Sequence, residues 1–270
     1  MGAGIAQVFI QAGFEVLLHD VKADVLEKAR TKISGEFSRA VARQEITKQD
    51  MEMMLSRLQM STGIGESRAC DVMIEAVVED LTVKKELLQK LDQLMPTHAI
   101  FASNTSSLPI TDMAAVTQRP EKVIGMHFMN PVPKMKLVEV IRGLRTSDHT
   151  STVIHTLADR LGKTAVEVQD FPGFVSNRIL MPMINEAIFT VYEGIATPKD
   201  IDTVMELGMN HPMGPLTLAD LIGLDTCLAI MEMLHEGFGD SKYRPCPLLR
   251  QYVKAGWLGK KVGRGFFEYS

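Results

Sequence analysis

The sequence has few cysteines and no long apolar run. Three cysteines occur among 270 residues, and they form neither a CxxC pair nor a metal-ligand spacing. This usage is typical of a reduced, cytosolic chain rather than of a disulfide-stapled scaffold. No stretch of about 18 apolar residues is present, and the N-terminus lacks the basic and apolar regions of a signal peptide. We therefore expect a cytoplasmic protein without a transmembrane helix.

The chain also lacks a strong excess of either charge. It has 29 basic and 33 acidic residues, a net charge of −4, so it has no overall electrostatic attraction to nucleic acid or anionic membranes. A local basic patch could still bind a phosphorylated ligand. Apolar residues make up 46% and charged residues 23%, as in average globular chains. Disordered, collagen-like and coiled-coil architectures are therefore excluded as the main architecture.

The motifs of several enzyme classes are absent. The sequence contains no G-x-S-x-G elbow and no P-loop, which argues against hydrolases and nucleotide triphosphatases. The seven histidines show neither an HExxH motif nor paired i, i+4 spacing, so we predict no metal site.

An alternation of strands and helices occupies the first 169 residues. A helical hairpin is expected over 22–58, and the other helices separate strands that are mostly apolar without alternation. This pattern predicts an α/β fold with a Rossmann-type, doubly wound sheet. The expected strands are 14–20, 72–77, 100–103, 123–128, 137–141 and 165–168.

The character of the sequence changes near residue 169. Almost only helical patterns follow, so we predict a dinucleotide-binding domain over 1–169 and an all-helical domain over 170–270. The expected helices are 174–194, 198–208, 214–222, 224–237 and 247–255.

The chain opens with a helical pattern instead of a strand. If Gly2 is the third glycine of a G-x-G-x-x-G fingerprint, the first glycine would precede Met1. Alternatively, Gly2 and Gly4 could be the first two glycines of the fingerprint. This match is poor, because Gln7 stands where the third glycine belongs. We therefore expect the first strand of the sheet and most of the glycine turn to be absent, which would weaken the binding of a dinucleotide.

Polar residues follow two of the expected strands. Open α/β sheets bind ligands at the carboxyl ends of their strands. Asp20 ends one strand, where an acid can bind the ribose hydroxyls of NAD and repel the 2′-phosphate of NADP. The cluster 104–107 follows another strand. An ordinary loop aspartate and a loop that caps the next helix are the structural alternatives.

His127 is the most informative single residue. It lies inside an apolar strand, and Glu139 follows twelve positions later in the next strand. Strands joined by a short loop can pair, which would bring the carboxylate to the imidazole. A carboxylate there fixes the tautomer of the histidine and stabilises the imidazolium, as in general acid–base catalysis. A plain buried ion pair is the alternative.

Asn177 stands near the start of the helical domain. We expect it in the first turn of its helix, where it either faces a ligand or acts as a capping residue.

Several segments, in order along essentially the whole chain, resemble the L-3-hydroxyacyl-CoA dehydrogenase family. Two more, 239–245 and 256–259, are most similar to bacterial members acting on 3-hydroxybutyryl-CoA. The resemblance implies hydride transfer between NAD and C3 of a 3-hydroxyacyl-CoA, with 3-hydroxybutyryl-CoA and acetoacetyl-CoA as the expected pair. The family segments are 4–7, 75–79, 102–107, 127–133, 136–140, 172–178 and 211–215.

The resemblance also implies roles for single residues. His127 would be the general base or acid, Glu139 would orient it, and both Ser106 and Asn177 would hydrogen-bond the acyl-CoA substrate. The positions that would lie at the cofactor are Gly2, Asp20, Glu79, Lys84, Asn104 and Lys261.

The hairpin 22–58 matches the coenzyme A region of the family. Where members often carry a serine and lysines, this chain has Glu36, Arg43 and Gln44. Arg43 could still bind a phosphate of the substrate.

The resemblance further implies a homodimer formed through the helical domain. Two other functions stay open: a binding or structural protein that no longer holds NAD, and a dehydrogenase of a free hydroxy acid. The apolar residues expected at the dimer face are Ile179, Met183, Ile184, Ala187 and Ile188.

Overall fold

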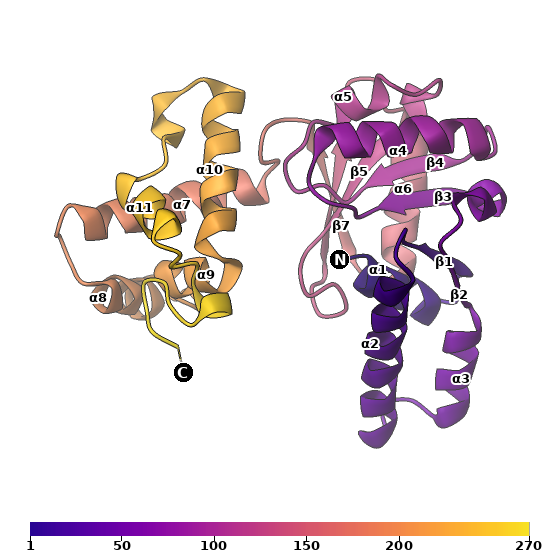
Figure 1. Cartoon of the computed structure of the whole chain (residues 1–270), viewed down its shortest axis with the longest axis horizontal. Helices are drawn as coiled ribbons and strands as arrows, with labels where there is room; N and C mark the ends of the chain where they lie inside the picture. Colours follow the sequence, from indigo (N-terminus) through magenta and orange to yellow (C-terminus); the bar gives the residue numbers. More distant parts are fainter. Residues whose placement is uncertain (270) are drawn as a thin grey trace. The chain divides into compact units, whose positions relative to one another are not determined.

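The computed structural model describes residues 1–269 and consists of two compact units, Met1–Asp170 and Phe171–Ser270 (Figure 1). The division falls one residue beyond the boundary expected from the sequence. Each unit has its own hydrophobic core. Within the described residues, no helix is long and apolar enough to cross a membrane.

The first unit begins with a helix. α1 (Gly2–Gln11) ends just before Gly13, whose φ of +90° is a conformation that glycine adopts readily. β1 (Val16–His19) follows and pairs in parallel with β2 (Leu58–Ser61). From the sequence, β2 was not expected, and Leu58 was expected at the end of a helix. A four-residue strand is too short to show a clear period.

Five further strands form the main sheet of this unit, in the order β3-β4-β5-β6-β7. All neighbours are parallel except β5 and β6, which are antiparallel and joined by a short loop. β4 and β5 are buried along their whole length, which explains their continuous apolar sequence. The five strands are β3 (Val72–Glu75), β4 (Ile100–Ser103), β5 (Val123–Phe128), β6 (Leu137–Arg142) and β7 (Thr164–Gln169).

The sheet is divided between β1 and β3. Within residues 1–269 no backbone pairing joins these two strands. Val16 of β1 and Val72 and Ile74 of β3 nevertheless pack against the same apolar cluster.

The predicted helical hairpin consists of α2 (Ala23–Ala42) and α3 (Lys48–Ser56), and it extends away from the sheet in Figure 1. Its core contact is made by Ile33 and Phe37, which pack against α1. The outer face of the hairpin is charged. The apolar stripe that contains Ile33 and Phe37 therefore holds the hairpin against α1.

Two longer helices flank the main sheet. α4 (Leu81–Leu94) is capped by Asp80, and α6 (Asp148–Arg160) by Ser147, whose side chain accepts from the backbone N–H of Thr150. Short helical segments complete the unit: η1 (Ile64–Ala69), α5 (Ile110–Ala114) and η2 (Pro120–Lys122).

The second unit is helical, as predicted. Thr197 caps α8, and Pro198 is its first residue. The described helices are α7 (Ser176–Tyr192), α8 (Pro198–Thr203), η3 (Val204–Gly208), α9 (Pro215–Ile222), α10 (Leu224–Phe238), η4 (Ser241–Tyr243), α11 (Pro247–Lys254) and η5 (Lys260–Val262).

One expectation about this unit is wrong. Ile184, Ala187 and Ile188 were expected on an exposed dimer face, but all three are buried in the core of the unit. Ile179 is exposed. The helical period of α7 was read correctly, but the side it buries was not, because sequence alone does not say what covers an apolar stripe.

Candidate active site

The carboxyl ends of three strands meet at one edge of the main sheet. β3, β4 and β5 are parallel, and β6 starts at this edge because it is antiparallel to β5. The edge therefore collects the residues at the ends of β3, β4 and β5 together with the start of β6.

His127 and Glu139 face each other across the β5–β6 pair. They are register partners, and Nδ1 of His127 lies 2.9 Å from Oε2 of Glu139. The structure thus confirms the prediction that the carboxylate of Glu139 lies beside the imidazole of His127. A carboxylate can only accept, so the proton of this hydrogen bond is on Nδ1. The other ring nitrogen, Nε2, lies 3.1 Å from Oγ of Ser106.

Asn104 fastens the loop that carries Ser106 to the strand that carries His127. The side-chain oxygen of Asn104 accepts a hydrogen bond of 2.9 Å from the backbone N–H of Phe128. Asn104 is buried. Its predicted contact with a cofactor stays a prediction, whereas its part in holding the loop is visible in the structure.

Glu79 holds the same loop from the side of β3. Its Oε1 accepts from the hydroxyl of Thr105 at 2.5 Å, the backbone N–H of Ser106 at 2.9 Å and the hydroxyl of Ser107 at 3.1 Å. Burial raises the pKa of Glu79, but the hydrogen bond from Thr105 and the charge of Lys84 outweigh it and lower the pKa below its ordinary value. Glu79 is therefore ionised at neutral pH.

Lys84 is buried in an ion pair that was not expected from the sequence. Its side chain is 1% exposed, and Nζ lies 2.9 and 2.8 Å from the two oxygens of Glu75 and 3.3 Å from Glu79. No separate role was predicted for Glu75. The sequence does contain an indication of one, because Glu75 is an acid inside an otherwise apolar strand.

Asp20 and Gly2 occupy places that suit a dinucleotide. Asp20 follows β1, is partly exposed, and accepts with one oxygen from the backbone N–H of Lys22 at 2.9 Å. Gly2 is the first residue of α1, and no side chain caps this helix. A carboxylate can hold ribose hydroxyls, and the uncapped N-terminus of a helix suits a pyrophosphate, so these residues fit NAD.

Three predicted residues lie elsewhere in the chain. Asn177 is in the first turn of α7, as expected, in the second unit. Lys261 also belongs to that unit and pairs with Asp225 at 2.6 Å. Arg43 follows α2 and pairs with Glu45 at 3.0 Å. The proposed contacts of these three residues with substrate or cofactor stay predictions.

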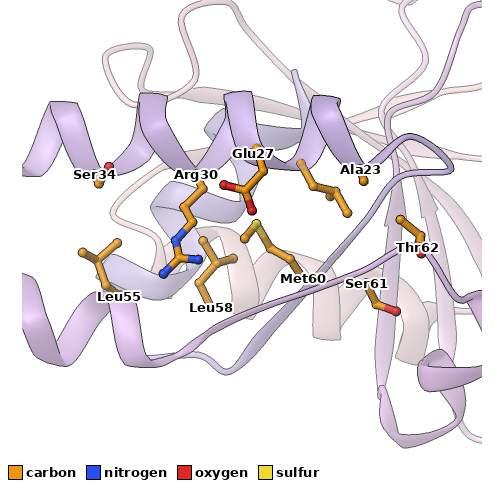
Figure 2. Close-up of a pocket in the computed structure, with 10 residues that line it drawn as sticks. Ala23, Glu27, Arg30, Ser34, Leu55, Leu58, Met60, Ser61 and Thr62 are labelled. Atoms are coloured by element: carbon orange, nitrogen blue, oxygen red, sulfur yellow. The ribbon is translucent and has the colours of Figure 1, made fainter.

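A pocket of about 530 Å³ lies in the hairpin region. Figure 2 shows Arg30 and Glu27 of α2 above Leu58 and Met60 of the β2 strand. None of the described residues that line this pocket is a predicted site residue, and Arg43 is not among them. The pocket lies in the hairpin region that the resemblance assigns to coenzyme A, and His127, Glu139 and Ser106 are not among its lining residues.

The fold and the sheet edge define a dinucleotide-dependent oxidoreductase: an acid follows β1, and a paired histidine and glutamate stand at the ligand-binding edge. The model of the NAD binding domain of 3-hydroxyacyl-CoA dehydrogenase matches residues 1–171, and that of the C-terminal domain matches 173–269. The chain therefore belongs to the 3-hydroxyacyl-CoA dehydrogenase family.

Individual relatives are similar over the whole chain. A probable 3-hydroxybutyryl-CoA dehydrogenase of Bacillus subtilis is 59% identical over 269 residues, which are 100% of this chain and 94% of the relative. The human mitochondrial hydroxyacyl-coenzyme A dehydrogenase is 42% identical over 277 residues, covering 100% of this chain and 88% of the relative. Among solved structures, (S)-3-hydroxybutyryl-CoA dehydrogenase from Ralstonia eutropha superposes with a TM-score of 0.98 at 47% identity and covers 100% of this chain and 95% of that one.

These matches confirm the family, the enzyme class and NAD as the cofactor. The alternative of a non-catalytic homologue is not favoured, because the relatives that match the full chain are dehydrogenases.

Proposed function

We propose that this enzyme interconverts 3-hydroxybutyryl-CoA and acetoacetyl-CoA. Relatives that carry the name 3-hydroxybutyryl-CoA dehydrogenase support this substrate. The observation that carries the chemistry is the continuous chain from Ser106 through His127 to Glu139, with links of 3.1 and 2.9 Å. Such a chain suits the removal of a proton from an alcohol.

His127 handles the proton in this proposal. Glu139 keeps the proton of the neutral imidazole on Nδ1. Nε2 therefore carries no proton and accepts the proton of the C3 hydroxyl during oxidation. The carboxylate then stabilises the imidazolium until the proton returns during reduction. Ser106 holds the reacting oxygen beside Nε2, and NAD, when bound, supplies the hydride acceptor or donor.

The chain's own groups would hold the cofactor and the substrate. Gly2 at the start of α1 would face the pyrophosphate, Asp20 the adenosine ribose, and Glu79 with its loop the nicotinamide side. Lys84, Asn104 and Lys261 are the remaining cofactor positions. Arg43 and Asn177 would bind the acyl-CoA.

The test is turnover of the purified chain with NADH and acetoacetyl-CoA, beside fluorescence titration with NADH. We expect saturable NADH binding, turnover of acetoacetyl-CoA, and a kcat/KM at least about tenfold lower with NADPH, because Asp20 repels the added phosphate. Equal turnover of free acetoacetate would instead identify a hydroxy-acid dehydrogenase. Lack of NADH binding would overturn the proposal.

We also propose a cytoplasmic homodimer that forms through the second unit. Large apolar side chains on this unit are exposed to solvent: Ile179 is 66% exposed, Leu207 83% and Met209 61%. Several such residues on one unit favour an interface with a second copy. Sedimentation should give twice the monomer mass, and Leu207→Glu should shift the protein toward the monomer. A wild-type monomer at micromolar concentration would contradict the proposal.

A further inference from the structure

We propose that Glu75 is a positioning residue for this reaction, acting through its neighbours on Ser106. The inference rests on the proposed function, because it concerns the same site. Glu75 lies outside the chain of hydrogen bonds from Ser106 through His127 to Glu139, and the family resemblance implies no separate role for it. Its place at the end of β3 and its contacts carry the inference.

Glu75 is completely enclosed, and its carboxylate has several donors. Its side chain is 0% exposed. Both oxygens accept from Nζ of Lys84, Oε2 also accepts from the backbone N–H of Val77 at 3.2 Å, and Oε1 accepts from the hydroxyl of Ser103. A buried carboxylate needs such compensation, so its orientation is tightly determined.

One route from Glu75 to Ser106 runs along the end of β4. The hydroxyl of Ser103, which donates to Glu75, also accepts from the backbone N–H of Thr105 at 3.1 Å. Thr105 directly precedes Ser106 in the chain. The carboxylate of Glu75 therefore determines where the backbone leaves β4 and enters the loop.

The second route runs through the buried ammonium group. Lys84 lies between Glu75 and Glu79, and Glu79 accepts from the hydroxyl of Thr105 and the backbone N–H of Ser106. Both routes thus reach Thr105, and the second also reaches the backbone of Ser106. Its hydroxyl stays 3.1 Å from Nε2 of His127.

A purely structural role does not account for this arrangement. Buried ion pairs contribute little net stability, and apolar residues of similar volume often replace them without loss. Around Glu75, every side-chain donor belongs to a segment that leads to the sheet edge: Ser103 ends β4, and Lys84 is in the first turn of α4. Burying these charges therefore adds little net stability, and what the arrangement provides is the placement of the loop.

The substitution Glu75→Gln tests the inference. It keeps the shape but removes the charge, which leaves Lys84 with Glu79 as the one carboxylate within 4.0 Å among the described residues. Glu79 then moves toward the ammonium and releases the loop. We expect kcat to fall about tenfold, because a small displacement of a positioned group lowers the rate of the chemical step. The KM values for acetoacetyl-CoA and NADH should stay within about threefold of wild type.

A double-mutant cycle with Ser106→Ala separates positioning from structure. If Glu75 acts through Ser106, Glu75→Gln should change kcat by less than about twofold once the hydroxyl is gone. If the tenfold loss persists in the Ser106→Ala background, or if Glu75→Gln alone has wild-type kcat, the inference is overturned.

Two further variants keep the test decisive. Ser103→Ala breaks one route but leaves the ion pair of Glu75 with Lys84 in place. Its smaller loss of kcat should also vanish in the Ser106→Ala background. Asp92→Asn is the matched control, because it weakens another buried ion pair, with Arg119 at 2.7 Å, away from this loop. It should lower the Tm and leave kcat unchanged. An inactive wild-type chain would refute the proposed function instead.

Discussion

Buried polar and charged residues at the sheet edge occur with partners. Counted over the whole residue, His127 is 6% exposed, Glu139 2%, Lys84 1% and Glu75 3%. Each of them has an oppositely charged or polar partner within 3.1 Å. An unpaired charge at these depths would cost several kcal/mol, so each partner fixes the other. Loss of one member is consequently expected to affect activity more than an ordinary surface substitution.

The first prediction concerns the proposed role of His127 in proton transfer. His127→Ala should lower kcat at least about a hundredfold, because general acid–base help is of that size. Steady-state kinetics with NADH and acetoacetyl-CoA measures the loss. His155→Ala is the control, since this histidine lies on α6 and faces Glu167 at 3.8 Å. Near-normal turnover of the His127 variant would remove this residue from the mechanism.

The second prediction concerns the pH dependence that Glu79 produces. Its pKa in the folded chain lies below the ordinary 4.5, because the hydrogen bond from Thr105 and the charge of Lys84 outweigh the opposing effect of burial. A lowered pKa means that the ionised carboxylate stabilises the fold fully above pH 4.5. That stabilisation is lost as the pH falls through the lowered pKa.

Urea unfolding of wild type and Glu79→Gln over a pH series tests this sign. Near neutral pH, the free energy of unfolding of the wild type should exceed that of Glu79→Gln by a constant amount. This difference between the two proteins should narrow below pH 4.5. A difference that does not change on acidification would show that the charge of Glu79 is not its source.

At the scale of elements, the close approach of β5 and β6 brings His127 to Glu139. Gly125 is two residues before His127 and faces Ile141 across the pair. A Cβ on Gly125 would lie 2.8 Å from Cβ of Ile141, closer than real side chains approach. The missing side chain therefore allows the two strands to pack tightly beside His127 and Glu139.

Gly125→Ala should accordingly reduce both stability and activity. We expect a loss of about 1–3 kcal/mol in the free energy of unfolding, as for other overpacked cores, and a lower kcat as β6 shifts away from His127. Denaturant unfolding and kinetics measure the two effects. Gly65→Ala is the control, since a Cβ there meets nothing within 4 Å. Unchanged stability of the Gly125 variant would contradict the packing argument.

At the scale of the whole molecule, each unit encloses its own hydrophobic core. The reactivity of the cysteines shows whether the core of the second unit stays closed. Cys227 and Cys246 lie in the core of the second unit, and Cys70 is half-buried in the first. Burial raises the pKa of the Cys227 thiol to about 12 and also raises that of Cys246. Only thiolates react quickly, so these two residues are protected while the second unit is folded.

Thiol labelling followed by mass spectrometry tests this protection. In the folded protein near pH 8, Cys227 and Cys246 should stay unlabelled, whereas all three cysteines should react after denaturation in guanidinium. Rapid labelling of Cys227 in the native protein would show that the core of the second unit opens readily.

Much of the architecture follows from local sequence. The Ser147 and Thr197 caps, the glycine after α1 and the apolar runs of β4 and β5 each act over a few residues, and they predicted the elements correctly. β2 was missed because four residues carry too little pattern. The side of α7 that is buried was misjudged because its partners lie far along the chain.

The sequence by itself determined the family, the order of the elements, the two domains, and the pairing of His127 with Glu139, because a short loop joins their strands. Only the tertiary structure showed that Glu75 binds both Lys84 and Ser103, the latter 28 residues away. It also placed Glu79 on the loop of Ser106. Contacts of this kind depend on which strands lie side by side, and desolvation then forces the buried charges to pair.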